Sequence, residues 1–219
     1  LNSGSLQNKI ENEIQVLSHD VIDQIAAGEV VERPAHLVKE LVENSIDAGA
    51  TSVAVNFSEG GKFVQVTDNG FGISPDQLGL ALDRHATSKI RLSSDLWRLH
   101  SFGFRGEALA SIAAVSRLTL VSRQREQKTA ARIVSEFGKR SCVEEIGGSF
   151  GTTITIEELF SNVPARLKFM KSAAAEGSRI KQTLKAIALS HPQVEIKVSQ
   201  DQQLLSFWPA CETRKQRVQ

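Results

Sequence analysis

The stretch from Pro34 to Gly49 reads Pro-Ala-His-Leu-Val-Lys-Glu-Leu-Val-Glu-Asn-Ser-Ile-Asp-Ala-Gly and decides how the rest of the chain is read. Proline suits the first helical position, where its missing N–H removes no hydrogen bond, and glycine suits the left-handed residue after a helix end. At 100° per residue, one contiguous arc is almost entirely apolar and holds Leu37, Val38, Leu41, Val42, Ser45, Ile46 and Ala48. The stretch therefore predicts an amphipathic helix whose apolar arc faces the core.

The opposite arc of this helix is polar and holds His36, Glu40, Glu43, Asn44 and Asp47. Amphipathic helices normally carry such residues on the solvated side, so the helix alone favours a plain surface. Glu40 and Asn44 are four residues apart and therefore stand on neighbouring turns of one face. A carboxylate and an amide oxygen at this spacing could serve a water molecule and a metal ion together.

The composition is that of an ordinary globular protein. The chain has 219 residues, of which 41% are hydrophobic and 23% charged, and its formal net charge of +1 gives no strong bias toward nucleic acid. Cys142 and Cys211 have no metal-ligand spacing, so free thiols are expected. No apolar run approaches the ~20 residues that cross a bilayer, and no signal-peptide pattern opens the chain. We therefore expect a cytoplasmic protein without membrane contact.

Strands and helices are interspersed around the central helix. Residues 53–57 and 63–68 alternate as two strands of a hairpin, and the Ser74-to-Gln77 segment has the pattern of a helix-starting capping box. An amphipathic helix is predicted over residues 176–191, and further strands over residues 118–123, 131–136, 141–145, 152–157, 194–198 and 204–208. This order predicts an α/β fold, a two-layer sandwich in which helices cover one face of a mixed, mainly antiparallel sheet.

The sequence divides the chain into three regions. Residues 1–13 are polar and patternless, which favours a flexible arm, whereas residues 14–210 form one domain. Residues 211–219 are interpreted as the start of a linker. Their basic residues, Arg214, Lys215 and Arg217, are interpreted as solvated surface.

Two further motifs carry possible chemistry. The strand ending in Asp68-Asn69-Gly70-Phe71-Gly72-Ile73 could bind adenine, because a buried carboxylate accepts an exocyclic amine and glycines permit close approach. Alone this motif is weak, since turns often use Asp and Gly for backbone reasons. Residues 103–107, Gly-Phe-Arg-Gly-Glu, lead into a helix that could present free N–H groups to an anion. The phosphate loop Gly-x-x-x-x-Gly-Lys-Ser/Thr is absent from the sequence.

The ordered series of motifs resembles the ATPase region of the MutL mismatch repair family, of bacterial type. This family lies within the group that includes gyrase B, Hsp90 and histidine kinases. The resemblance runs from about residue 14 to residue 208, and the stretches that carry it are residues 24–34, 39–50, 68–73, 84–89, 103–112 and 151–153. It implies the ATPase sandwich fold of that group.

The resemblance also implies a role for each motif. Glu40 matches the general base that activates the water attacking the γ-phosphate, and Asn44 matches the Mg²⁺ ligand. Asp68 matches the carboxylate that binds adenine, and Thr153 matches a threonine below the base. Further nucleotide contacts are expected from Ala48, Gly70, Gly72, Ile73, Thr87, Ser88 and Lys89, and from the lid residues Gly103, Phe104, Arg105, Gly106, Glu107, Ala108 and Leu109.

Several of these residues also have plainer interpretations. Glu107 could satisfy the N-terminus of its own helix, and Arg105 could form a structural ion pair. Thr153 could be ordinary β-branched packing within a strand. His85 and Lys89 could simply belong to a loop.

By resemblance, the chain is a fragment that binds Mg²⁺·ATP and belongs to an ATP-gated dimeric clamp coupling mismatch recognition to downstream repair. Its implied partners are a MutS-type mismatch recognition protein, DNA mainly through a second domain, and a second copy joined by ATP-dependent dimerisation of the N-terminal regions. Without the lysine that the second domain donates, turnover is expected to be weak or absent. Two other classes stay open: a histidine-kinase-type phosphotransferase, and an interaction module that binds nucleotide without hydrolysing it.

Overall fold

The computed structural model describes residues 16–17, 22, 28, 30–89 and 106–218, and within them nine strands form one sheet. The sheet order is β5-β4-β3-β7-β2-β1-β8-β9, with β6 paired to β4. The strands are β1 Ser52–Ser58, β2 Phe63–Asp68, β3 Arg117–Arg123, β4 Ala130–Glu136, β5 Lys139–Arg140, β6 Glu144–Ile146, β7 Gly151–Glu157, β8 Glu195–Gln200 and β9 Gln203–Trp208. Neighbouring strands are antiparallel except β1 and β8, which are parallel. The predicted mixed, mainly antiparallel sheet is confirmed.

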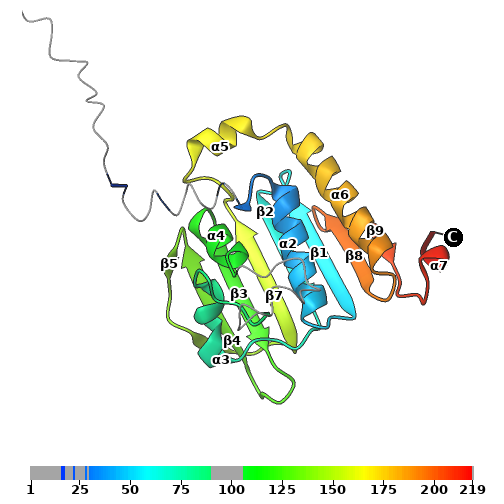
Figure 1. Ribbon diagram of the computed structural model, residues 1–219, viewed down its shortest axis with the longest axis horizontal. Helices are drawn as coiled ribbons and strands as arrows, with labels where there is room; N and C mark the ends of the chain where they lie inside the picture. Colours follow the sequence, from blue (N-terminus) through cyan, green and yellow to red (C-terminus); the bar gives the residue numbers. More distant parts are fainter. Residues whose placement is uncertain (1–15, 18–21, 23–27, 29, 90–105, 219) are drawn as a thin grey trace, which may run out of the picture.

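Helices form the second layer. They are α2 Pro34–Asp47, α3 Pro75–Leu78, the 3₁₀ turn η1 Leu80–Leu82, α4 Ala108–Ala114, α5 Pro164–Phe169, α6 Ala173–Ser190 and α7 Arg214–Val218. Helices α2 and α6 pack side by side across one face of the sheet (Figure 1), so the predicted two-layer sandwich is also confirmed. Within the described ranges, no helix has the length and apolar character that a membrane span requires.

The central helix α2 follows the predicted pattern closely. It starts at Pro34 and ends at Asp47, and Gly49 adopts the left-handed conformation with φ of 71°. Its buried inner side includes Leu37, Val38, Leu41, Val42 and Ser45. The alternate residues of β1 and β2 that belong to the same core are Val53, Val55, Phe57, Val64 and Val66. Because burying each large apolar side chain contributes about 1.5–3 kcal/mol, this contact orients the polar arc of α2.

Two local predictions are wrong. The predicted helix start is confirmed, since Ser74 is the N-cap of α3, but the predicted side-chain cap is wrong: the Ser74 hydroxyl caps no helical N–H, its backbone carbonyl accepts from the Gln77 N–H at 3.0 Å, and α3 lasts only four residues. The strand predicted over residues 141–145 is replaced by the short strands β5 and β6. Between them, the Ser141 hydroxyl accepts a hydrogen bond from the Val134 N–H at 3.1 Å, so a side chain supplies the acceptor that a regular ladder takes from the backbone.

The interpretation of the basic tail as solvated surface is wrong for Arg217. This residue is only 9% exposed, and its guanidinium lies against the loops that flank β8 and β9. Hydrogen bonds run from it to the carbonyl oxygens of Pro209 at 2.8 Å, Pro192 at 2.5 Å, Val194 at 2.7 Å and His191 at 3.2 Å. Helix α7 is thereby attached to the sandwich, while the predicted domain boundary at residue 210 stays a prediction.

We expect Arg217→Ala to lower the free energy of unfolding by about 1.5–3 kcal/mol, because hydrogen bonds from a charged group are lost and buried carbonyls are left unpaired. Urea unfolding followed by circular dichroism measures this change. The control is Arg214→Ala, which removes an exposed arginine from the same helix and should change the free energy by less than about 0.5 kcal/mol. Equal effects of the two substitutions would contradict the anchoring role of Arg217.

Candidate functional site

Asp68, at the end of β2, is a buried acid whose hydrogen bonds join three elements. It is 8% exposed, and its Oδ1 accepts from the Gly70 N–H at 2.9 Å and the Thr152 N–H at 3.2 Å, while its Oδ2 accepts from the Ser45 hydroxyl at 2.8 Å. Burial raises the pKa of Asp68, and these three donors oppose the rise because they stabilise the ionised form. The carboxyl group therefore links β2, β7 and α2 at one point.

The glycines after Asp68 allow other parts of the backbone to come close. A Cβ atom at Gly70 would lie 2.7 Å from the Ala48 carbonyl oxygen at the end of α2. Gly72 has φ of 74°, and a Cβ atom there would lie 2.3 Å from the Arg123 carbonyl oxygen at the end of β3. These approaches are closer than any side chain permits, so both glycines are required by the packing of this turn before any ligand is considered.

The polar arc of α2 is partly buried rather than simply solvated. Burial raises the pKa of Glu40; the Glu43 carboxylate adds to the rise, whereas positive groups on Lys39, Lys89 and His36 oppose it. Asn44, one turn further along, accepts a hydrogen bond from the ammonium of Lys89 at 3.0 Å. These surroundings place Glu40 and Asn44 in a charged environment that is partly screened from solvent.

The loop over residues 84–89 contacts the base of the predicted lid. The His85 N–H donates to the Gly106 carbonyl at 3.0 Å, and a Cβ atom at Gly106, whose φ is 64°, would lie 2.4 Å from the Ala86 carbonyl oxygen. Glu107 occupies the N-cap of α4 but accepts no helical N–H with its side chain, so the interpretation that it satisfies its own helix is wrong. Its Oε1 lies 3.4 Å from the Nδ1 of His85 instead.

Thr153 does not lie beside Asp68. It is paired in register with Thr67, whose hydroxyl lies 3.2 Å from its own, and both point to the face of the sheet opposite Asp68. The threonine on the Asp68 side is Thr152, which pairs directly with Asp68 and whose hydroxyl lies 2.9 Å from that of Ser122. The structure therefore places Thr152, rather than the predicted Thr153, on the side of the sheet that carries Asp68.

The structure brings most of the remaining predicted residues to the same end of the sheet. Ala48, Gly70, Gly72 and Ile73 follow α2 and β2, and the Ile73 N–H donates to the Ser122 hydroxyl at 2.8 Å. The other predicted residues within the described part of the chain lie in the 84–89 loop or at the start of α4; they are Thr87, Ser88, Lys89, Gly106, Glu107, Ala108 and Leu109. Gly103, Phe104 and Arg105 lie outside the described residues.

Sequence reasoning missed three residues of this site: Ser45, Asp47 and Thr152. Ser45 interrupts the otherwise apolar arc of α2, and a lone hydroxyl among buried aliphatic residues signals a buried polar partner. Asp47, whose Oδ2 lies 2.5 Å from the Lys89 Nζ, belongs to the polar arc that already suggested a site. Thr152 carried no signal of its own, because which of two successive threonines faces Asp68 depends on strand register.

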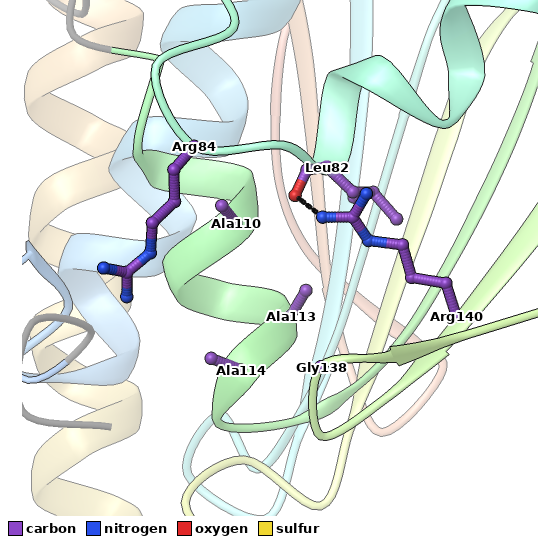
Figure 2. Close-up of a pocket in the computed structure, with 7 residues that line it drawn as sticks. All are labelled: Leu82, Arg84, Ala110, Ala113, Ala114, Gly138 and Arg140. Atoms are coloured by element: carbon purple, nitrogen blue, oxygen red, sulfur yellow. Dashed lines mark hydrogen bonds between the residues drawn. The ribbon is translucent and has the colours of Figure 1, made fainter. Parts of the chain in front are cut away.

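A small cavity beside α4 is separate from this site (Figure 2). Its volume is about 100 Å³, room for roughly three water molecules, and its lining residues are Leu82, Arg84, Ala110, Ala113, Ala114, Gly138 and Arg140. Figure 2 shows Arg140 reaching back to the Leu82 carbonyl while Arg84 extends away from it. Arg140 also lies 2.5 Å from the Asp83 carboxylate, so it fastens η1 to β5. None of Glu40, Asn44 and Asp68 lines this cavity.

Comparisons with known proteins identify the family. Residues 32–147 match the family described as histidine kinase-, DNA gyrase B- and HSP90-like ATPase. The solved Aquifex aeolicus MutL ATPase domain complexed with ADP superimposes with a TM-score of 0.73 and 31% identity, covering 86% of this chain and 68% of that one. The chain belongs to the MutL family.

Curated relatives support the same family assignment for this MutL-family domain. The MutL protein of Agathobacter rectalis is 52% identical over 185 residues, which are 84% of this chain and 28% of the relative. That of Neisseria meningitidis serogroup C is 50% identical over 198 residues, 90% of this chain and 30% of the relative. The family predicted from the motifs is confirmed, and the chain spans less than a third of the length of these relatives.

Asp68→Asn tests the electrostatics of the buried acid. Asparagine can accept from Gly70 and Thr152 through its oxygen and donate to Ser45 through its amide, so the hydrogen-bonding positions are kept. The pKa of Asp68 is higher in the folded protein than its ordinary value of 3.8. The protonated acid therefore stabilises the folded protein at pH values below 3.8, and this stabilisation is lost as the pH rises through the pKa of the folded state.

We therefore expect the free energy of unfolding of the wild type to fall relative to Asp68→Asn as the pH rises from the ordinary value of 3.8. Urea unfolding at several pH values measures the difference. A difference that stays constant as the pH rises would show that the pKa of Asp68 is not raised.

Proposed function

We propose that this domain binds ATP with Mg²⁺ and hydrolyses it slowly. One observation carries the proposal: Ser45, next to Asn44 on α2, holds Asp68 at 2.8 Å. A base acceptor, a metal ligand and a general base thereby share one rigid frame of α2 and β2. The bound ADP in the related Aquifex aeolicus domain supports a nucleotide as the ligand.

Asp68 would recognise adenine. Its Oδ2 accepts one hydrogen bond from Ser45 and has capacity for a second, which the exocyclic amine of adenine could fill. Its Oδ1 is already held by two backbone N–H groups, so the carboxyl group keeps its orientation. Thr152, whose backbone makes one of these bonds, replaces Thr153 as the proposed threonine beside the base.

The residues present fit a magnesium ion at Asn44. The Asn44 Oδ1 already accepts from a cationic group, the Lys89 ammonium at 3.0 Å, and an amide oxygen is a ligand that Mg²⁺ accepts. In the described part of the chain, no cluster of three or more His, Cys, Asp or Glu residues could hold a metal ion. Phosphate oxygens and water would therefore complete the ligand set. Mg²⁺, when bound, would neutralise charge on the phosphates.

Glu40 would act as the general base. An ionised carboxylate can orient a water molecule and accept its proton, and a pKa raised by burial makes Glu40 a stronger base than an exposed glutamate. The 84–89 loop and Gly106 to Leu109 would lie along the phosphates with the lid residues Gly103, Phe104 and Arg105. The contact between Gly106 and Ala86 supports a joint role for the loop and the lid base.

For the whole protein we propose the clamp that the family membership suggests. Nucleotide binding would close the lid and bring two N-terminal regions together, and hydrolysis would reset them. A MutS-type protein and DNA are the proposed partners, the latter mainly through a second domain. Action in the cytoplasm stays a prediction from the sequence.

Asn44→Ala tests the metal ligand. We expect calorimetry with a non-hydrolysable ATP analogue to show affinity that rises at least about tenfold with Mg²⁺ in the wild type and no such rise in the variant, because one protein ligand is lost. The control is Glu43→Gln on the same helix, which should keep the Mg²⁺ effect. Equal Mg²⁺ dependence in wild type and Asn44→Ala would remove Asn44 from the metal site.

Glu40→Gln tests the general base. We expect phosphate release from ATP to fall about 10²–10⁴-fold while the analogue still binds, because glutamine cannot accept the proton. In the wild type the rate should rise with pH through the raised pKa of Glu40. The control is Glu59→Gln, which changes an exposed glutamate in the turn between β1 and β2. Full hydrolysis by Glu40→Gln would exclude this role, and labelled phosphate on a protein acceptor would indicate a phosphotransferase.

A further inference from the structure

Lys89 places a positive charge directly on the proposed metal ligand. Its Nζ lies 3.0 Å from the Asn44 Oδ1 and 2.5 Å from the Asp47 Oδ2. The Lys89 side chain is 18% exposed and that of Asp47 is 29% exposed, so the ammonium is largely shielded while Asp47 stays partly open to solvent. The ammonium thus bridges two oxygen atoms on consecutive turns of the polar arc of α2.

The ammonium comes from outside α2, on a loop that connects to the lid. The Lys89 N–H donates to the Thr87 hydroxyl at 3.1 Å, which braces the loop at this point. Four residues earlier, the His85 N–H donates to Gly106 at the base of the lid. The position of the ammonium is therefore linked through the backbone to the segment that leads into α4.

Ammonium and metal would compete for the Asn44 oxygen. The ammonium of Lys89 lies 3.0 Å from this oxygen, and Mg²⁺ binds its oxygen ligands at about 2.0–2.1 Å. Two cations on one oxygen in a partly buried site would repel each other strongly. Lys89 at Asn44 therefore disfavours a metal ion on the same oxygen.

We propose that Lys89 is a built-in counter-cation that keeps free divalent ions off Asn44 until a nucleotide arrives, a role that rests on the proposed function. The phosphates of the nucleotide offer the ammonium other acceptors, so Asn44 is released as the nucleotide binds. The metal ion then enters with the nucleotide rather than before it. An ion pair between Lys89 and Asp47 that only stabilised the loop would have no such effect on metal binding.

Removal of the ammonium tests this role without measuring hydrolysis. Mn²⁺ binding to the nucleotide-free protein is followed by electron paramagnetic resonance, for wild type, Lys89→Met and Lys89→Gln. We expect each variant to bind one Mn²⁺ at least about tenfold more tightly than the wild type, because Asn44 and Asp47 become available to the ion. Lys89→Arg should exclude Mn²⁺ as the wild type does.

The added site is located with two further variants. Lys89→Met combined with Asn44→Ala should lose the gained Mn²⁺ affinity, and Lys39→Met, which removes the lysine paired with Glu43 on the same helix, should not gain it. Circular dichroism melts establish that every variant is folded.

The inference and the proposed function fail in different ways. If Lys89→Met and Lys89→Gln bind Mn²⁺ no more tightly than the wild type without nucleotide, the counter-cation role is overturned. If the wild type binds neither the ATP analogue nor Mn²⁺ in its presence, the proposed function itself fails. Mn²⁺ binding to the wild type with the analogue, together with tighter nucleotide-free binding to the variants, supports both.

Discussion

The structure depends on the need to satisfy one buried carboxyl group. Asp68 ends a central strand at 8% exposure, and an unpaired acid there would be strongly unfavourable. Its three donors come from the following turn, from β7 and from α2, so satisfying them fixes the relative positions of these elements. The hydrogen bonds of Asp68 thus depend both on the register of β2 and β7 and on the placement of α2 on the sheet. The site around Asp68 is therefore preorganised, and a ligand would bind to a carboxyl group whose orientation is already fixed.

The central helix α2 contributes to both the core and the candidate site because one side of it is apolar and buried and the other is polar. Its inner arc packs on β1 and β2, and this apolar contact holds the outer arc in place without any ligand. On the outer arc, burial raises the pKa of Glu40, while Lys39, Lys89 and His36 oppose the rise. Lys89 also neutralises Asp47 and contacts Asn44. The charges near the proposed phosphate site are thus balanced by lysines before any cation is bound.

Several errors of sequence reasoning share one cause. Thr152 and Thr153 are chemically identical neighbours, and only pairing with β2 decides that Thr152 faces Asp68. Arg217 lies in a short basic run that is indistinguishable from solvated surface until the carbonyls that it binds are brought together from residues 191–209. The orientation of Thr152 and the burial of Arg217 depend on partners that are distant in the sequence. Local composition does not indicate which residues those partners are.

The sequence by itself determined the elements whose signals are local. The periodicity of residues 34–49 predicted α2 and its buried arc, alternation predicted β1, β2 and β8, the strand β9 was predicted as the partner of β8, and the ordered motifs led to the MutL family. Only the tertiary structure decided how these pieces meet: that Ser45 binds Asp68, that Thr152 rather than Thr153 faces Asp68, and that Lys89 reaches Asn44. Periodicity reports which side of an element is apolar, whereas a hydrogen bond between distant residues forms only when packing brings donor and acceptor within about 3 Å.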